Sequence, residues 1–174
     1  MRFLAISGSL RLNSTNTALL DAFIRHADEG IAIELCGNVG LLPLFNPDLE
    51  ADTPQAVVDF ATKVDQCDGL LIASPEYAHG IPGALKNALD WLVSRFEIPD
   101  KPVMLVHASA RGSFVREQLC EVLKTMSCRI CLDSFECHLI SKSPAEIGEI
   151  LDQPPERDAI RNAVAAFAHF VEQS

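Results

Sequence analysis

Long hydrophobic runs are missing from this sequence. No apolar stretch approaches the roughly 20 residues that are needed to cross a bilayer. The N-terminal residues 1–6 run straight into a glycine turn, without the longer apolar region and small-residue cleavage site of a signal peptide. We therefore expect no association with membranes and a cytoplasmic location.

Positive charge is also scarce. Lys and Arg together number 14, against 24 Asp and Glu, which gives a formal net charge of −10. A nucleic-acid-binding protein needs an excess of cations to neutralise phosphates, so we expect no nucleic-acid partner. An acidic protein can still bind a phosphate if donors are placed locally, which makes the position of each arginine informative.

A complete zinc-binding pattern is absent, although the chain has six cysteines. The nearest approach is Cys128-x2-Cys131-x5-Cys137-His138. Cys128 and Cys131 have opposite parity along a predicted strand, so they would point to opposite faces of a sheet. No second CxxC pair completes a set of four ligands. We therefore expect free thiols packed as small hydrophobic groups, and no metal site.

Short apolar runs alternate with segments of helical periodicity along the 174 residues. This length is typical of one domain, so we expect a single domain over 1–174. The apolar runs predict five strands, at 2–7, 31–35, 68–73, 103–107 and 130–135. The periodic segments predict five helices, around 19–27, 54–64, 85–92, 115–123 and 160–171, while 141–157 is proline-bearing and polar and has no predicted element. This alternation is typical of a three-layer α/β sandwich with a parallel sheet.

Ligands of such sheets bind beyond the carboxyl ends of the strands, where the strand order reverses. The loop after the first predicted strand carries hydroxyls, an amide and the cation of Arg11 immediately before a helix. The unpaired N–H groups of a helix start, with about half a positive charge, favour an anion there. An ordinary polar turn with a helix cap would also explain the serines and the asparagine. Arg11 and the position after a parallel strand favour a phosphate site.

Two common nucleotide-binding motifs do not fit this loop. Its spacing is too short for G-x-x-x-x-G-K-[ST] and it lacks the lysine of that motif. The loop is not a G-x-G-x-x-G either, which disfavours a nicotinamide cofactor bound in the dinucleotide manner. A phosphate bound at this loop would therefore be held by neither of these two motifs.

Two motifs carry a family resemblance. The first is Gly8-Ser9-Leu10-Arg11-x-x-Ser14-x-Asn16-x-x-Leu19, and the second is Pro75-Glu76-Tyr77-x-x-Gly80-x-Pro82-Gly83-x-Leu85-Lys86-Asn87-x-x-Asp90-Trp91. In this order and spacing the chain resembles the NAD(P)H-dependent FMN reductase family, which includes flavodoxin-like quinone, azo-dye and chromate reductases. The resemblance implies a flavodoxin-like five-stranded parallel sheet of order 2-1-3-4-5. It also implies FMN as cofactor and NADPH or NADH as hydride donor.

The resemblance assigns residues to FMN. The phosphate contacts that it implies come from the side chains of Ser9, Arg11, Ser14 and Asn16, and from the backbone of Thr15 and Thr17. The residues implied to border the isoalloxazine ring are Pro75, Glu76, Tyr77 and Ala78 on one side, and Ser109, Ala110, Arg111 and Gly112 on the pyrimidine side. No side-chain catalyst is implied, because the flavin carries the chemistry.

The sequence departs from the family at two positions. The family often has asparagine where this chain has Ala78, so one polar contact near the ring or ribityl chain is either missing or made by backbone. The loop after the fourth predicted strand is usually glycine-rich, whereas here it reads His107-Ala108-Ser109-Ala110-Arg111-Gly112-Ser113. Arg111 could stabilise negative charge on reduced flavin or bind an anionic substrate, and it could equally be a solvated loop arginine.

The resemblance further implies ping-pong hydride transfer through FMN to small electron acceptors, and a homodimer or homotetramer. Trp91, which is out of phase with the apolar face of its predicted helix, is a candidate anchor between subunits. One alternative is a non-catalytic FMN-binding electron carrier or sensor. Another is a serine hydrolase, suggested by Ser7-Gly8-Ser9-Leu10 after the first predicted strand, for which the late histidines His138 and His169 lie in no recognisable motif.

Overall fold

A computed structural model describes residues 1–109, 112–139 and 142–173. Five parallel strands form one sheet in the order β2-β1-β3-β4-β5, which confirms the predicted fold class and strand order. The strands are β1 (Arg2–Ser7), β2 (Ala32–Leu35), β3 (Gly69–Ala73), β4 (Pro102–His107) and β5 (Arg129–Glu136). Every residue of β3 and β4 is buried, as expected for the central strands of a parallel sheet covered on both faces.

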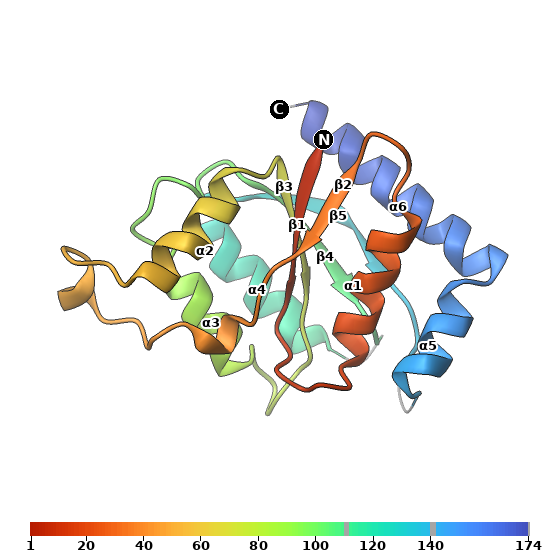
Figure 1. The fold of residues 1–174 in the computed structure, drawn as a ribbon, viewed down its shortest axis with the longest axis horizontal. Helices are drawn as coiled ribbons and strands as arrows, with labels where there is room; N and C mark the ends of the chain where they lie inside the picture. The colour runs from red at the N-terminus through yellow and green to blue at the C-terminus, as the bar shows by residue number, and fades with distance from the viewer. Residues whose placement is uncertain (110–111, 140–141, 174) are drawn as a thin grey trace.

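Helices cover both faces of the sheet (Figure 1). On one face lie α2 (Gln55–Asp65), α3 (Gly83–Asp90) and α4 (Ser113–Thr125), and on the other lie α1 (Thr15–His26), α5 (Pro144–Leu151) and α6 (Pro154–Glu172). Two short 3-10 helices, η1 (Val39–Leu41) and η2 (Pro47–Leu49), interrupt the long segment between β2 and α2.

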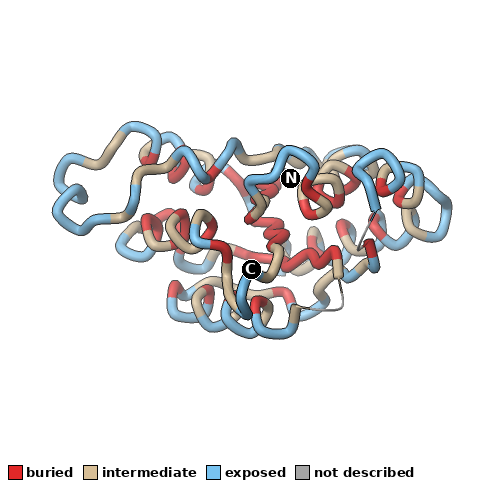
Figure 2. The backbone as a smooth tube through the Cα atoms, turned by 90° about the horizontal axis from the view of Figure 1, so that it is seen from below, coloured by how far each residue is buried: buried red, intermediate tan, exposed pale blue. Residues whose placement is uncertain are grey.

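The strand pleat divides the core between the two faces. Leu4 and Ile6 of β1 pack in the α2–α3–α4 cluster, whereas Phe3 and Ala5 pack in the α1–α5–α6 cluster. Buried residues are concentrated in the central layer, between helices whose outer faces are exposed (Figure 2). These two apolar clusters hold the sheet between the helical layers and fix the positions of the loops at its edges.

Helix α5 is an element that the sequence analysis missed. The polar residues and prolines of 141–157 predict a segment without regular structure, and this prediction is wrong. Ser143 accepts a hydrogen bond from the N–H of Glu146 (3.3 Å), and the Glu146 carboxylate accepts one from the N–H of Ser143 (2.8 Å). This capping box starts the helix, and Ile147 and Leu151, one turn apart, bury its apolar side.

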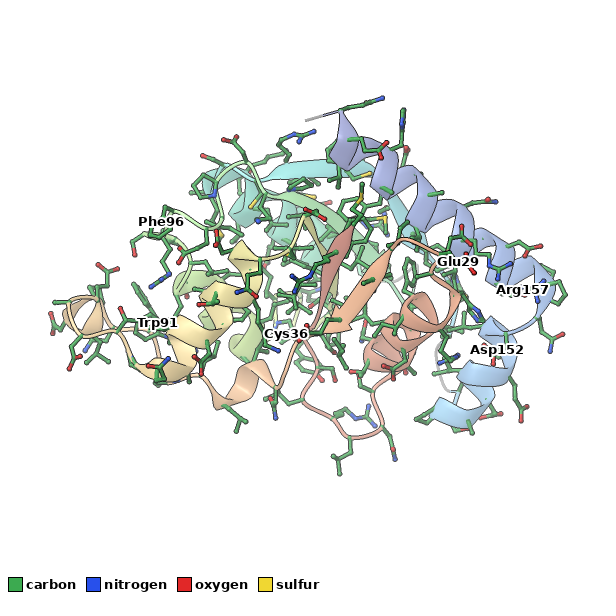
Figure 3. The ribbon with its side chains drawn as sticks, turned by 45° about the horizontal axis from the view of Figure 1, so that its top comes forward. Glu29, Cys36, Trp91, Phe96, Asp152 and Arg157 are labelled. Atoms are coloured by element: carbon green, nitrogen blue, oxygen red, sulfur yellow. The ribbon has the colours of Figure 1, made fainter. Side chains whose placement is uncertain are left out.

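Trp91 lies inside the protomer, so its prediction as a subunit anchor is wrong. Its side chain is only 2% exposed, and its indole N–H donates to the carbonyl of Pro43 (2.7 Å). The ring also packs edge-on against Phe45, with ring centroids 5.1 Å apart. Figure 3 shows Trp91 on the side of the molecule where the long segment after β2 extends. Trp91 therefore fastens this segment to the end of α3.

Among the described residues, no helix combines the length and the apolar character that spanning a bilayer requires.

Candidate functional site

A cavity of about 410 Å³ opens at the carboxyl ends of β1, β3 and β4, within the size range of small-ligand sites. The loops after β1 and β3 meet at this edge of the sheet (Figure 1). Residues from all three loops line the cavity: Ser9, Arg11, Ser14, Thr15, Asn16, Ser74, Pro75, Glu76, Tyr77, His107, Ala108, Ser109, Gly112 and Val115. The cavity thus brings together most of the residues that the sequence assigned to a cofactor.

Gly8 allows the first loop to leave β1 beside the neighbouring strand and helix. Its N–H donates to the carbonyl of Ala73 at the end of β3 (2.8 Å). A Cβ at this position would lie 2.9 Å from Leu85 Cδ2 and 3.0 Å from Ser74 Oγ. A side chain at this position would clash with Leu85 and Ser74 unless they shift, and this close approach explains the glycine.

Ser14 is the N-cap of α1. Its hydroxyl oxygen accepts a hydrogen bond from the N–H of Thr17 (3.2 Å), and both Ser14 and Asn16 are buried. The hydroxyl hydrogen of Ser14 remains available to a ligand in the cavity. Thr15 and Asn16 form the first turn of the helix, where backbone N–H groups have no partner within the helix.

Thr17 does not line the cavity. Its N–H is bound to Ser14, and its hydroxyl forms a hydrogen bond with the hydroxyl of Ser7 (2.8 Å). The resemblance predicts Thr17 as a backbone donor to a phosphate, and in this structure that donor is used to cap the helix. Thr17 therefore supports the loop from behind.

Arg11 places the positive charge of the first loop. Its side chain is exposed and lines the cavity, and it has no ion-pair partner among the described residues. A guanidinium, the first turn of α1 and several hydroxyls therefore converge on one end of the cavity. This donor set fits a phosphate monoester, which needs several hydrogen bonds and one compensating charge.

The loop after β3 forms a tight turn. Tyr77 and Gly80 exchange two backbone hydrogen bonds, of 3.1 Å and 3.0 Å, around Ala78 and His79. Both central residues have positive φ angles, 50° and 59°, which is the arrangement of a two-residue hairpin turn that favours Asn and Gly. Tyr77 lines the cavity and is 51% exposed, whereas Ala78 does not line it. Ala78 therefore shapes the turn without contributing to the cavity wall.

The third wall comes from the end of β4 and the start of α4. Ser109 and Gly112, which are predicted beside the ring, line the cavity, and Ala110 and Arg111 lie outside the described residues. Sequence reasoning missed four lining residues, namely Ser74, His107, Ala108 and Val115. Ser74, His107 and Ala108 lie where β3 and β4 end, and Val115 lies in α4. Their position at the strand ends was the available signal, but the family motifs assigned none of the four to the cofactor.

His107 is a buried histidine in this wall. Its side chain is 5% exposed, and its Nε2 has no hydrogen-bond partner among the described residues. Burial lowers the pKa of His107 to about 4, and the nearby Arg116 guanidinium adds to this effect, so the imidazole is neutral at physiological pH. The late histidines, His138 and His169, are not among the residues that line the cavity. The serine-hydrolase alternative therefore loses the two late histidines that the sequence offered as its base.

The cysteines lie apart from the cavity lining. Burial raises the pKa of Cys36 to about 11 and that of Cys128 to about 12, which disfavours their reactive thiolate forms. No cluster of three or more His, Cys, Asp or Glu residues suited to a metal ion is found in the part of the chain that the structure describes.

Comparisons with known proteins identify the family to which this chain belongs. The family described as NADPH-dependent FMN reductase matches residues 1–137. The chain is 33% identical to the NADH:(hydroxy)cinnamate reductase subunit CrdA of Vibrio ruber over 160 residues, which cover 88% of this chain and 79% of that protein. It is also 42% identical to the NAD(P)H-dependent FMN reductase PA1204 of Pseudomonas aeruginosa, over 63% of this chain and 60% of that protein.

Two further similarities extend over the whole chain. The quinone reductase of Escherichia coli is 27% identical over 99% of this chain and 96% of that protein. Among solved structures, the NAD(P)H:acceptor oxidoreductase FerB of Paracoccus denitrificans superimposes with a TM-score of 0.80 at 21% identity, covering 99% of this chain and 97% of that one. At that identity the superposition supports the fold, which is flavodoxin-like. The chain belongs to the NADPH-dependent FMN reductase family and is an enzyme of the NAD(P)H-dependent FMN or quinone reductase type.

Proposed function

We propose that the cavity binds FMN, with the phosphate against the first loop and the isoalloxazine ring against the loops after β3 and β4. Ser9, Arg11 and Ser14–Asn16 form the phosphate end of the cavity. Its ring end is formed by Pro75–Tyr77, Ser109, Gly112 and Val115. The family and the cavity lining support this assignment. The observation that carries it is the Arg11 guanidinium, unpaired among the described residues, in the loop before α1, which lines the same cavity as the Tyr77 ring.

The chain's own residues have simple tasks in this proposal. Arg11, the Ser14 hydroxyl and the first turn of α1 bind the phosphate and anchor the cofactor. Pro75 and Tyr77 provide a stiff, flat border for the ring. Arg111, which lies outside the described residues, keeps its predicted role beside the pyrimidine side of the ring. FMN held by these residues would supply the redox chemistry, that is, hydride transfer from NADH or NADPH and two-electron reduction of a small acceptor.

The acceptors that we propose are quinone-like or other small oxidised molecules. The names of the relatives support this class, since they include quinone reductases and a hydroxycinnamate reductase subunit. A cavity that admits the nicotinamide and the acceptor in turn has to be open on one side. Ping-pong kinetics with no covalent enzyme intermediate would follow from this sharing of one cavity.

We also propose a homodimer or homotetramer. Trp91 is buried inside the protomer and does not support this proposal. The support comes from two large exposed apolar side chains nearby, Leu44 (82% exposed) and Phe96 (84% exposed). Light scattering coupled to size exclusion would report a mass of two or four times 19.0 kDa. A monomeric mass over the working concentration range would contradict this proposal.

The test of the proposed function is an anaerobic reduction. The purified protein, reconstituted with FMN, should show the spectrum of bound oxidised flavin and lose it on mixing with NADH or NADPH. Addition of a quinone should then restore the spectrum in a second, separate phase. Failure to bind FMN after reconstitution would contradict the whole proposal. Binding without reduction by either nucleotide would instead favour the electron carrier or sensor.

A further inference from the structure

Helix α4 begins at the ring end without a cap of its own. Its N-cap residue is Gly112, which has no side chain and makes no capping hydrogen bond. The N–H groups of the first turn of any helix lack partners within the helix and carry a partial positive charge. Gly112 and Val115 both line the cavity, so this positive helix end lies in its wall.

Glu76 caps this helix from the opposite loop. Its Oε2 accepts a hydrogen bond from the N–H of Val115 (3.1 Å), which is the third residue of α4. An N-cap side chain normally satisfies this N–H, so Glu76 occupies the place of a cap from 39 residues away in sequence. Glu76 also lines the cavity, with 20% of its side chain exposed. One carboxylate therefore joins the two walls of the ring end.

Three more contacts hold the Glu76 loop against α4. Gln118 donates from Nε2 to the carbonyl of His79 (2.9 Å), and its Oε1 accepts from the N–H of Ile81 (3.3 Å). The His79 ring packs edge-on against Phe114, with centroids 4.4 Å apart, and its Nδ1 lies 3.4 Å from Glu76 Oε1. Among the described residues, His79 is the basic group within ion-pair distance of Glu76. The carboxylate is thus fixed at the cavity wall by contacts on both sides.

The charge of Glu76 has a consequence for redox chemistry at the ring end. Without Glu76, the start of α4 would present unpaired N–H groups to the cavity and would favour an added negative charge there. The carboxylate occupies one of these donors and brings a full negative charge of its own. A flavin that takes up a hydride gains two electrons and one proton, so it gains one negative charge. This charge is less favourable beside Glu76.

Resting on the proposed binding of FMN, we propose that Glu76 is a redox-tuning residue: its carboxylate, held on the first turn of α4, disfavours reduced FMN and makes the bound cofactor a stronger reductant. Glu76 exchanges no electrons or protons in this role. It acts through its charge and through the helix N–H that it occupies. A stronger reductant passes electrons more readily to acceptors of low potential, at the cost of a smaller driving force for reduction by the nicotinamide.

The experiment compares the dissociation constants of oxidised and reduced FMN for the wild-type protein and for Glu76→Gln. Glutamine keeps an oxygen that can accept from Val115 and removes the charge. We expect the ratio of the oxidised to the reduced dissociation constant to rise about tenfold, which for a two-electron couple equals a midpoint potential higher by about 30 mV. The midpoint potential, measured with reference dyes, checks this value independently of turnover.

Two further variants provide the controls. Glu121→Gln makes the same change of charge on α4 at a residue outside the cavity lining, and its ratio should stay within about twofold of wild type, because exposed charges are screened. Glu76→Asp keeps the charge and should keep the low potential. An unchanged ratio in Glu76→Gln, or an equal rise in Glu76→Gln and Glu76→Asp, would overturn the proposal. If the wild-type protein binds no FMN in either state, the proposed function itself fails, which is a distinguishable result.

Discussion

The phosphate end of the cavity is built within one stretch of sequence, whereas the ring end depends on contacts between loops that are far apart in the chain. At the phosphate end, Ser14 caps α1 through a residue three positions away, and Arg11 lies on the same loop. At the ring end, Glu76 caps α4 across 39 residues, and the turn at Ala78 and His79 has an unfavourable backbone. Because its contacts are local, the phosphate end can be predicted from the sequence, and it does not depend on the ring end.

This difference indicates where changes should affect binding and where they should affect both binding and stability. Arg11 is exposed and unpaired among the described residues, so its removal leaves the fold intact. Around the ring end, His107 and Val115 are buried and Ala78 and His79 have positive φ angles, so changes at these residues alter the protein even without a ligand.

The largest effect is expected for Arg11→Ala. A hydrogen bond to a charged group contributes about 1.5–3 kcal/mol, so the affinity for FMN should fall about 10- to 100-fold. The melting temperature without FMN should be unchanged. Flavin fluorescence titration and thermal unfolding measure the two quantities. The matched control is Arg157→Ala on α6, an arginine paired with Asp158, and equal losses of affinity in the two variants would remove Arg11 from the phosphate end.

His107, in the cavity wall, gives the stability of the protein a dependence on pH. Its pKa is lowered to about 4 in the folded chain, whereas an unfolded histidine has a pKa of about 6.5. The unfolded chain therefore binds the proton first, and the stability present above pH 6.5 is lost as the pH falls toward 4.

Between pH 7.5 and pH 5, this single group should reduce the free energy of unfolding by about 2 kcal/mol. Urea unfolding at both pH values should show a smaller loss for His107→Asn than for the wild-type protein, because the variant cannot bind this proton. Equal losses in the two proteins would show that the imidazole is protonated or solvated in the folded chain.

Ser14 tests whether capping and phosphate binding can be separated. Ser14→Ala removes the cap of α1 and should reduce the free energy of unfolding by about 1 kcal/mol, together with FMN affinity. Ser14→Asp restores a cap acceptor but places a negative charge beside the phosphate. The aspartate variant should regain most of the lost stability, as measured by urea unfolding, while its FMN affinity falls further. Recovery of both properties would contradict a phosphate beside Ser14.

The smallest effect is expected at Ala78. Its φ of 50° lies in a region that costs a non-glycine residue about 1–2 kcal/mol, and asparagine tolerates this region better. Ala78→Asn should therefore raise the free energy of unfolding by about 0.5 kcal/mol, and Ala78→Val should lower it. Thermal unfolding of the two variants should bracket the wild-type melting temperature. A lower melting temperature for Ala78→Asn would show that the turn is not strained at this position.

The contrast between the two ends also explains what could be predicted from the sequence. The strands, the first loop and its donors follow from local patterns, because a buried strand, a glycine exit and a helix cap each lie within a few residues. The strand order is not local and was implied by the family resemblance. Helix α5 was missed although its capping box was present, since prolines and polar residues masked the signal. Trp91 was misplaced because its partner, Pro43, lies 48 residues away.

The ring end could only be predicted in outline. The motif around Pro75 indicated a ring border, but nothing local shows that Glu76 caps α4 or that His107 is buried beside Arg116. These contacts arise from packing between elements that the sequence does not bring together. Residues such as Glu76 and His107, whose contacts are distant in sequence, can be identified only from the structure.

The most direct test of a phosphate-anchored cofactor is a comparison of FMN with riboflavin, which lacks the phosphate. If the phosphate end anchors the cofactor, the wild-type protein should bind FMN about 100-fold more tightly than riboflavin, because several charge-assisted hydrogen bonds are lost with the phosphate. In Arg11→Ala this difference should shrink, while the affinity for riboflavin stays the same. Equal affinities of the wild-type protein for FMN and riboflavin would contradict a phosphate held by Arg11 and the start of α1.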